Sequence, residues 1–261
     1  MHKARKRFGQ HFLHDQMVIQ RIIDYVNPQT DDELVEIGPG QGALTLPLLK
    51  RCRKLTAIEL DRDLIAILQR KADSLGQLTL INEDVLTFDF TQLPNHQKIR
   101  VIGNLPYNIS TPLMFHLLES SERIIDMNFM VQKEVALRIV ASPGDRNYGR
   151  LSVMLQYACQ CTYLFEVGPQ SFSPPPKVDS AVIRLRPHKI KPAVVGQYQV
   201  FSEIVKLAFA QRRKTLSNAL KDRVDKDTLA ELDISPKSRA EELSLEDFAR
   251  ISRRLSTHEY E

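Results

Sequence analysis

The amino-acid sequence predicts an α/β fold with a doubly wound parallel sheet, followed by a small all-α domain. Three observations lead to this prediction. Short apolar runs alternate with helix candidates as far as Arg186, a Gly-rich turn follows the first of these runs, and helical periodicity alone is found after Pro192. The hydrophobic content of 43% is ordinary for a globular protein. We therefore expect two domains, formed by residues 1–189 and 190–261.

The first half of the chain alternates helix and strand candidates as βαβ units require. Residues 15–26 have helical periodicity, with Val18, Ile22 and Val26 on one apolar stripe. Residues 34–37 form an apolar run that ends at the Gly-rich turn, as expected of a buried strand. The elements expected after this strand are a helix over 42–51, a strand over 55–60, a helix over 61–73, and strands over 78–81 and 99–103.

The second half completes the sheet and then becomes helical. A strand is expected over 127–131, helices over 133–141 and 150–158, and two closing strands over 161–167 and 181–186. Beyond Pro187 the expected helices span 198–209, 215–221, 226–232 and 245–255. Ser244 and Asp247 are close to a capping box, which marks the start of the last helix.

The composition excludes several classes of protein. No apolar run has the length of a membrane span, and the basic N-terminal segment is not followed by the apolar core of a secretion signal. We therefore expect a cytoplasmic protein that does not associate with a membrane. Cys52, Cys159 and Cys161 lack the spacing of a zinc site, so we expect reduced packing cysteines and no metal.

Acidic side chains are placed at the ends of consecutive strands, where open α/β sheets bind their ligands. The run from Glu36 to Gly42 reads Glu-Ile-Gly-Pro-Gly-Gln-Gly, and its glycines permit a tight turn and close approach of a ligand to the backbone. Glu59 lies at the end of the second strand and suits the two hydroxyls of a ribose, as found for both NAD and S-adenosylmethionine. Asp84 follows the third strand and can accept the adenine amino hydrogen, which favours S-adenosylmethionine.

The fourth strand ends at Asn104-Leu105-Pro106-Tyr107, which presents an amide, two carbonyls and an aromatic ring together. This set suits the methylation of an exocyclic amino group on a nucleobase. The Asn104 side-chain oxygen and the Leu105 carbonyl can accept its N–H hydrogens, and the Tyr107 ring can stack on an extruded base. By itself such a tetrapeptide is mostly a Pro-containing turn, so its significance depends on the acidic residues upstream.

Several segments together resemble the ribosomal RNA adenine dimethyltransferases. Besides the Gly-rich turn and Asn104–Ser110, these are Arg7–Leu13, the late segment Phe172–Ser180 and the segment Phe209–Leu216, so the resemblance extends from residue 7 to about residue 220. Within the family, the length, the late segment and the C-terminal segment are most similar to the bacterial enzymes that dimethylate two adjacent adenosines near the 3′ end of small-subunit ribosomal RNA.

The resemblance implies a Rossmann-like, S-adenosylmethionine-dependent catalytic domain with a basic N-terminal arm. The residues implied in cofactor binding are His11, Leu13, Gly38, Gly40, Glu59, Asp84, Val85 and Asn104. The residues implied at the target base are Asn104, Leu105, Pro106, Tyr107 and Phe172, with Phe172 stacking on the other face of the base. The family usually has Asn where this chain has His11. Either side chain can donate a hydrogen bond to the cofactor, but His titrates near neutrality and can add a pH dependence.

Two basic clusters are candidates for binding RNA phosphates. They consist of Arg5, Lys6 and Arg7 in the N-terminal arm, and of Arg212, Arg213 and Lys214 after the first C-terminal helix. Charge alone fits a solvated tail and a helix end equally well. With the resemblance, we expect small-subunit ribosomal RNA, or a precursor of the small ribosomal subunit, as the partner of a monomeric enzyme.

Three alternative functions compete with this interpretation. A large-subunit ribosomal RNA adenine methyltransferase of the antibiotic-resistance type shares the core motifs, but the late and C-terminal segments match it less well. A non-catalytic RNA-binding factor for ribosome assembly or transcription can use the same fold, although the catalytic motif is intact here. A nicotinamide oxidoreductase fits the glycine pattern, but leaves Asp84 and Asn104 without a role.

Overall fold

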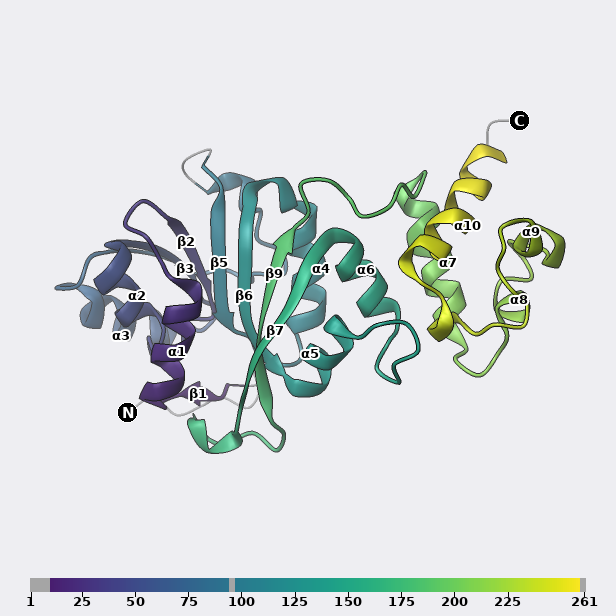
Figure 1. Cartoon of the computed structure of the whole chain (residues 1–261). Helices are drawn as coiled ribbons and strands as arrows, with labels where there is room; N and C mark the ends of the chain where they lie inside the picture. Colours follow the sequence, from purple (N-terminus) through teal and green to yellow (C-terminus); the bar gives the residue numbers. More distant parts are fainter. Residues whose placement is uncertain (1–9, 94–96, 259–261) are drawn as a thin grey trace. The chain divides into compact units, whose positions relative to one another are not determined.

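The computed structural model describes residues 10–93 and 97–258, which form two compact units (Figure 1). The first unit contains the residues up to 136 together with residues 162–187, and the second contains residues 137–161 together with the residues from 188 onwards. Residues 137–161 therefore group with the C-terminal residues, which the sequence pattern did not indicate. The N-terminal cluster Arg5, Lys6 and Arg7 lies outside the described residues.

A seven-stranded sheet has the order β4-β3-β2-β5-β6-β9-β7. Its strands are β2 (Glu33–Ile37), β3 (Lys54–Ile58), β4 (Gln77–Ile81), β5 (Ile99–Asn104), β6 (Ile124–Gln132), β7 (Cys159–Val167) and β9 (Ser180–Pro187). Neighbouring strands from β4 to β6 are parallel, whereas β9 pairs antiparallel with β6. The predicted α/β fold is confirmed, and the antiparallel β9 modifies the expected all-parallel sheet.

The strand order changes direction at β2, which lies between β3 and β5. On the side of β3, Ile37 pairs with Ile58. On the side of β5, Glu36 pairs with Ile102. Connections on the two sides of such a strand diverge and leave a crevice at its carboxyl end. The Gly-rich turn that follows Ile37 lies at this crevice.

Helices flank the sheet in Figure 1. They are α1 (Gln16–Val26), α2 (Thr45–Cys52), α3 (Arg62–Ala72), α4 (Ser110–Glu119) and α5 (Lys133–Val140). Asp15 caps α1 by accepting hydrogen bonds from Met17 N and Val18 N, and Asp61 caps α3. The sequence did not predict α4, because its apolar residues form a nearly continuous run without helical periodicity.

The N-terminal segment is joined to the late segment by a short two-stranded sheet. β1 (Phe12–Leu13) pairs antiparallel with β8 (Phe172–Ser173), so that Leu13 lies opposite Phe172. His14 N donates to Ser171 O at 3.0 Å and Ser171 Oγ donates to Asp15 Oδ2 at 3.0 Å. Two-residue strands have no periodicity to detect, so this connection between distant segments was not predicted.

The second unit is built from helices around aromatic side chains. Its helices are α6 (Arg150–Ala158), α7 (Tyr198–Ala210), α8 (Leu216–Ala219), α9 (Lys226–Glu231) and α10 (Leu245–His258). The Phe209 ring lies 5.9 Å from that of Tyr148 and 5.7 Å from that of Phe248. Ser244 N donates to Asp247 Oδ2 and Asp247 N donates to Ser244 Oγ, which confirms the predicted capping box at α10.

Short 3-10 helices complete the two units. They span Phe90–Gln92, Ser121–Arg123, Pro169–Ser171 and Ala240–Glu242. Within residues 10–93 and 97–258, no helix combines the length and the apolar character needed to cross a membrane. The same residues include no group of three or more His, Cys, Asp or Glu side chains placed to hold a metal ion.

Candidate active site

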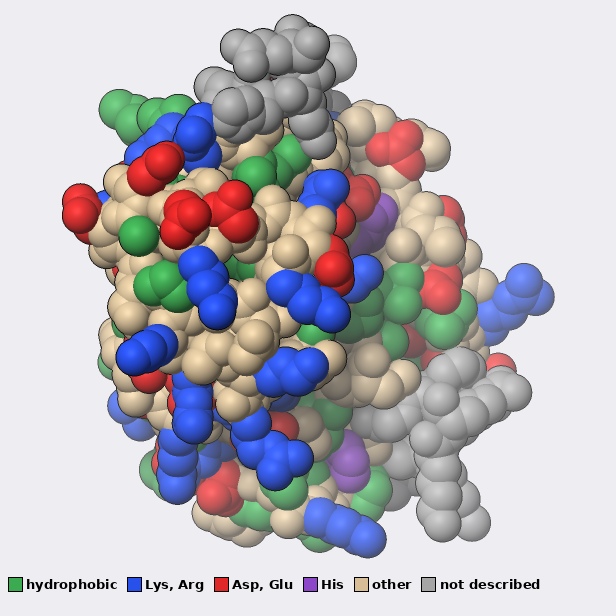
Figure 2. Space-filling view, turned by 90° about the vertical axis from the view of Figure 1, so that its right-hand side faces the viewer, with side chains coloured by type: hydrophobic (Ala, Val, Ile, Leu, Met, Phe, Trp, Pro, Cys, Tyr) green, Lys and Arg blue, Asp and Glu red, His purple; other side chains and the backbone are tan. Residues whose placement is uncertain are grey.

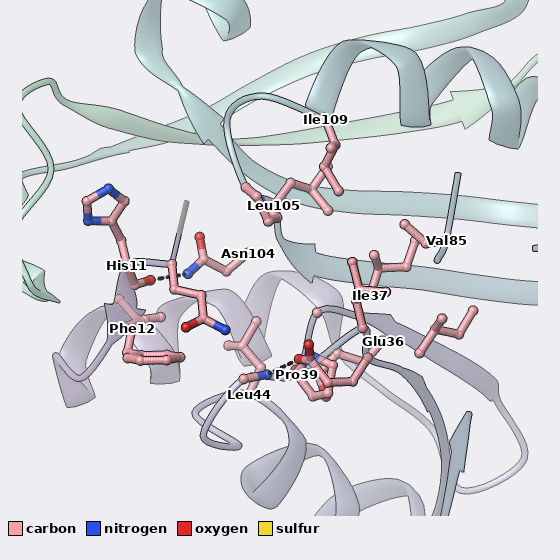
Figure 3. Close-up of a pocket in the computed structure, with 18 of the residues that line it drawn as sticks. His11, Phe12, Glu36, Ile37, Pro39, Leu44, Val85, Asn104, Leu105 and Ile109 are labelled. Carbon is pink, nitrogen blue, oxygen red and sulfur yellow. Dashed lines mark hydrogen bonds between the residues drawn. The ribbon is translucent and has the colours of Figure 1, made fainter. Parts of the chain in front are cut away.

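A pocket of about 350 Å³ opens at the carboxyl ends of the parallel strands (Figure 3). This volume is within the range of small-molecule sites. Its walls come from β1, from the Gly-rich turn after β2, from the residues that follow β3 and β4, and from the segment after β5. The pocket thus collects the ends of four consecutive parallel strands, all within the first unit.

The Gly-rich turn places backbone rather than side chains against the pocket. Gly38 has a φ of +64° and Gly40 a φ of +56°, which L side chains rarely adopt. A Cβ at Gly38 would point into open space, whereas one at Gly40 would lie 3.2 Å from the Phe12 ring. The turn therefore leaves room for a ligand directly beside the backbone.

Glu59 is fixed at the end of β3 by two backbone amides. Its Oε2 accepts from Gly40 N at 3.1 Å and its Oε1 from Asp61 N at 2.8 Å. Burial raises the pKa of Glu59, and the hydrogen bonds from Asp61 and Gly40 oppose this rise. Each carboxylate oxygen has a further lone pair, so the side chain can still accept from a pair of ligand hydroxyls.

The end of β4 supplies a polar residue and an apolar one. Asp84 is exposed at the pocket, and its Oδ1 accepts from Leu86 N at 3.0 Å. Val85 beside it is 6% exposed and lines the pocket with an apolar surface. Asn82 Nδ2 donates to Glu59 O at 2.7 Å, which fixes the ends of β4 and β3 to each other. A flat heterocycle with an amino group suits this combination.

The Asn104 amide has a defined orientation. Its Nδ2 donates to the backbone carbonyl of His11 at 3.0 Å, as the dashed line in Figure 3 shows. One hydrogen of the amide nitrogen is engaged by His11, the residue before β1, and the acceptor Oδ1 is available to a ligand. Leu105 N donates to Met130 O at 3.1 Å, which fixes the backbone of the next residue. The orientation of Asn104 therefore depends on the N-terminal segment.

Tyr107 is held at both its hydroxyl and its ring. The hydroxyl lies 2.8 Å from Ser180 Oγ, and the ring is stacked on that of His11 with a centroid separation of 5.8 Å. Burial raises the pKa of Tyr107, so the hydroxyl stays neutral at physiological pH. His11 Nδ1 lies in turn 2.8 Å from Pro174 O. Three of the five segments that carried the family resemblance thus meet at one ring.

The pocket brings together nearly all residues expected at the cofactor and the base. It is lined by His11, Leu13, Gly38, Gly40, Glu59, Asp84, Val85, Asn104, Leu105, Pro106 and Tyr107. The exception is Phe172, which is 3% exposed and belongs to the hydrophobic core, opposite Leu13 in the pairing of β1 with β8. That its ring stacks on the target base stays a prediction.

Arg212, Arg213 and Lys214 are exposed in the second unit, after α7. Arg212 Nη2 donates to Arg146 O at 2.5 Å and lies 3.4 Å from Glu241 Oε2, so this side chain also stabilises its own unit. Figure 2 shows a face on which Lys and Arg side chains extend over the middle and lower parts, while most Asp and Glu side chains lie in the upper part. Exposed cations on such a face can reach phosphates.

Sequence reasoning missed a role for Glu36, which also lines the pocket. This side chain is 2% exposed, and its Oε2 and the Thr45 Oγ1 are both buried without a hydrogen-bond partner among the described residues. Burial raises the pKa of Glu36 to about 8; the nearby Thr45 hydroxyl opposes this rise and the Glu59 carboxylate adds to it. The position of Glu36 at the head of the Gly-rich turn was the available signal.

Comparisons with known proteins agree over nearly the whole chain. The family model described as "Ribosomal RNA adenine dimethylase" matches residues 1–257. Two curated relatives are named Ribosomal RNA small subunit methyltransferase A. The one from Saccharophagus degradans is 52% identical over 255 residues, covering 97% of this chain and 95% of the relative. The one from Nitrosococcus oceani is 54% identical over 253 residues, covering 97% and 96%.

Solved structures give the same result at lower identity. A dimethyladenosine transferase from Plasmodium falciparum superposes with a TM-score of 0.80 at 26% identity, covering 92% of this chain and 96% of that one. The 23S rRNA methyltransferase ErmE superposes with a TM-score of 0.74, also at 26% identity, covering 94% and 99%.

Proposed function

Because the chain belongs to the ribosomal RNA adenine dimethylase family, we propose that it transfers two methyl groups to N6 of each of two adjacent adenosines near the 3′ end of small-subunit ribosomal RNA. The observation that carries the proposal is the oriented amide of Asn104, whose nitrogen donates to His11 O and whose oxygen remains for the target amine. The enzyme acts in the cytoplasm as a monomer, and a precursor of the small ribosomal subunit is its substrate.

The pocket residues fit S-adenosylmethionine. The Gly38 backbone leaves open space for the methionine portion, Glu59 accepts from the ribose hydroxyls, and Asp84 with Val85 receives the adenine. His11 and Leu13 cover the site from β1. When bound, the cofactor supplies a methyl group on a positively charged sulfur, which an amine can attack directly.

The protein makes the adenine amine a nucleophile by holding it. The lone pair of this nitrogen is delocalised into the ring. Hydrogen bonds from its two N–H groups to Asn104 Oδ1 and Leu105 O favour a tetrahedral nitrogen with its lone pair directed at the methyl group. Tyr107 stacks on the base, and Ser180 with His11 sets the plane of its ring. Proximity and alignment supply much of the rate. With Glu59 and Asp84 holding the cofactor, the methyl carbon would pass from its sulfur to this nitrogen, and the proton on the nitrogen would leave to solvent afterwards.

Dimethylation places a further requirement on the two acceptors. The unmodified amine has two hydrogens, but the monomethylated product has one. One of the two acceptors, Asn104 Oδ1 or Leu105 O, must therefore lose its contact in the second transfer, and the pocket must hold a methyl group there. Rotation about the C6–N6 bond between the two transfers lets the remaining hydrogen bond to either Asn104 Oδ1 or Leu105 O.

RNA docking uses basic side chains of both parts of the chain. We assign this role to Arg212, Arg213 and Lys214, and to the N-terminal Arg5, Lys6 and Arg7. Phosphate contacts of this kind position a structured RNA and weaken as salt is added.

A specific observation favours the small over the large ribosomal subunit. The relatives at 52% to 54% identity are small-subunit methyltransferases, whereas the large-subunit enzyme ErmE is 26% identical. The intact Asn104 site speaks against a purely structural assembly factor.

The test is methyl transfer from labelled S-adenosylmethionine to each ribosomal subunit, purified from a strain that lacks the modification. Mass spectrometry of the nucleosides reads the product. We expect dimethyladenosine at two adjacent positions of small-subunit RNA. Transfer to large-subunit RNA alone, or no transfer to either subunit, would overturn the proposal.

A further inference from the structure

Glu36 is a buried acid in the pocket wall that the mechanism above does not use. It lies in β2 directly before Ile37, and Figure 3 shows it beside Ile37 and Pro39. The side chain is 2% exposed, and its Oε2 has no hydrogen-bond partner within the described ranges. An ionised carboxylate without hydrogen bonds or a countercharge is very unfavourable in such a place.

Among the described residues, the Thr45 hydroxyl favours the negative charge of Glu36, but burial outweighs this effect. Glu59, at the end of the neighbouring β3, adds a second carboxyl to the same pocket and raises the pKa of Glu36 further. On α2, the Thr45 hydroxyl is also without a partner among the described residues, and burial raises the pKa of the Cys52 thiol, so that this thiol is neutral. The ammonium of Lys71, on α3, donates to the carbonyl of Gln41 at 2.9 Å. The pocket-facing residues Asp84 and Asn104, after β4 and in β5, add no cation.

The proposed cofactor brings the missing countercharge. S-adenosylmethionine carries a sulfonium and an α-ammonium, both on its methionine portion. The proposed roles of Glu59 and Asp84 are at the ribose and the adenine, so neither acid remains for these cations. Glu36 is the acid of the Gly-rich turn, where the methionine portion has room beside Gly38.

We propose that Glu36 holds a proton in the free protein and releases it to solvent when the cationic methionine portion of S-adenosylmethionine binds. The inference rests on the proposed function, because it needs that cofactor in this pocket. The resulting carboxylate then pairs with the ligand cation, by a hydrogen bond where this cation is the ammonium and by charge alone where it is the sulfonium. Either cation supplies the partner that Oε2 lacks among the described residues. Glu36 thereby selects a cationic ligand over a neutral nucleoside, and it does so by changing charge rather than by being charged in advance.

Isothermal titration calorimetry of the full-length protein tests the proposal. Binding is measured at pH 6.5 in two buffers of different ionisation enthalpy, phosphate and imidazole, so that the slope of the heat gives the number of protons released. The ligands are S-adenosylmethionine, S-adenosylhomocysteine, which keeps the ammonium only, and 5′-methylthioadenosine, which has neither cation. With a pKa of about 8, Glu36 is almost fully protonated at pH 6.5.

We expect S-adenosylmethionine to release about one proton from the wild-type protein and 5′-methylthioadenosine to release none. Release by S-adenosylhomocysteine identifies the ammonium as the trigger, and its absence identifies the sulfonium; both support the proposal. Glu36→Gln should bind S-adenosylmethionine at least tenfold more weakly and release no proton. Glu33→Gln, at the other end of β2, is the matched control and should keep the wild-type proton count.

Two outcomes overturn the inference. One is binding of S-adenosylmethionine to the wild-type protein without proton release, and the other is the same release from Glu36→Gln. Neither outcome affects the proposed function, because the ligand still binds. If S-adenosylmethionine produces no binding heat in either buffer or at a second temperature, the proposed function itself fails. Thermal unfolding of each variant shows that it is folded.

Discussion

At the residue scale, the site depends on hydrogen bonds between segments that are far apart in the sequence. The chemistry of Asn104 could be predicted from its residue type and from its place after a buried strand. The contact of its Nδ2 with His11 O could not, because it requires β1 to lie across the end of β5. Likewise, Glu36 could be recognised as part of a motif, but its lack of a partner is a property of the packed fold.

The Tyr107 ring and its hydroxyl have separable roles. Removing the ring in Tyr107→Ala should weaken capture of the base far more than removing the hydroxyl in Tyr107→Phe, because stacking contributes about 1–3 kcal/mol per base. Tyr107→Phe and Ser180→Ala break the same 2.8 Å contact and should show the same small loss. The measurement is KM for RNA at saturating cofactor. Equal losses in Tyr107→Ala and Tyr107→Phe would assign the role to the hydroxyl.

Glu36 also makes the stability of the ligand-free protein depend on pH. Its pKa is about 8 in the folded protein and close to 4.5 when unfolded. Between these values the folded state binds more protons, so the stability contributed by Glu36 is lost as pH rises from about 5 to about 8. Glu36→Gln cannot ionise and should gain on the order of 3 kcal/mol on the wild type between pH 5 and pH 8. Denaturant unfolding of both proteins at pH 5 and pH 8 measures this gain. If the stability difference between Glu36→Gln and the wild type is the same at both pH values, Glu36 is already ionised at pH 5.

At the element scale, the central strands β2 to β6 follow the sequence pattern closely, because buried parallel strands are short apolar runs with clear ends. The pattern was insufficient in three places. The helix α4 has a nearly continuous apolar run, β1 and β8 are two residues long, and the antiparallel direction of β9 is set by its pairing with β6. These last features depend on contacts across the chain rather than on local periodicity.

Phe172 tests the role of the small β1–β8 sheet. Because its ring lies in the core opposite Leu13, Phe172→Ala should lower the free energy of unfolding by about 3–5 kcal/mol. Phe172→Leu fills most of the space and should keep most of the stability and the turnover. Denaturant unfolding and kcat are measured on both variants. A Phe172→Leu protein of wild-type stability that has lost turnover would instead support a direct contact with the base.

At the scale of the whole molecule, a catalytic pocket in the first unit is combined with a second unit that displays exposed cations. Replacing Arg213 and Lys214 by Ala should weaken binding of small-subunit RNA about tenfold and make its salt dependence shallower by roughly two charges. Arg212 is left in place because it bonds to Arg146 O. Fluorescence anisotropy at several salt concentrations measures the slope. The affinity for S-adenosylmethionine serves as the control and should be unchanged; an unchanged salt slope would assign RNA docking to other residues.

The central claim is that the amide of Asn104 holds the target amine. It is tested most directly by comparing Asn104→Ala with the wild type on small ribosomal subunits that lack the modification, with mass spectrometry of the nucleosides and with calorimetry of S-adenosylmethionine binding. We predict that the variant binds the cofactor within about tenfold of the wild type, since the proposed contacts of Glu59 and Asp84 remain, and produces neither mono- nor dimethyladenosine. Dimethyladenosine formed by Asn104→Ala at a rate close to that of the wild type would contradict the account.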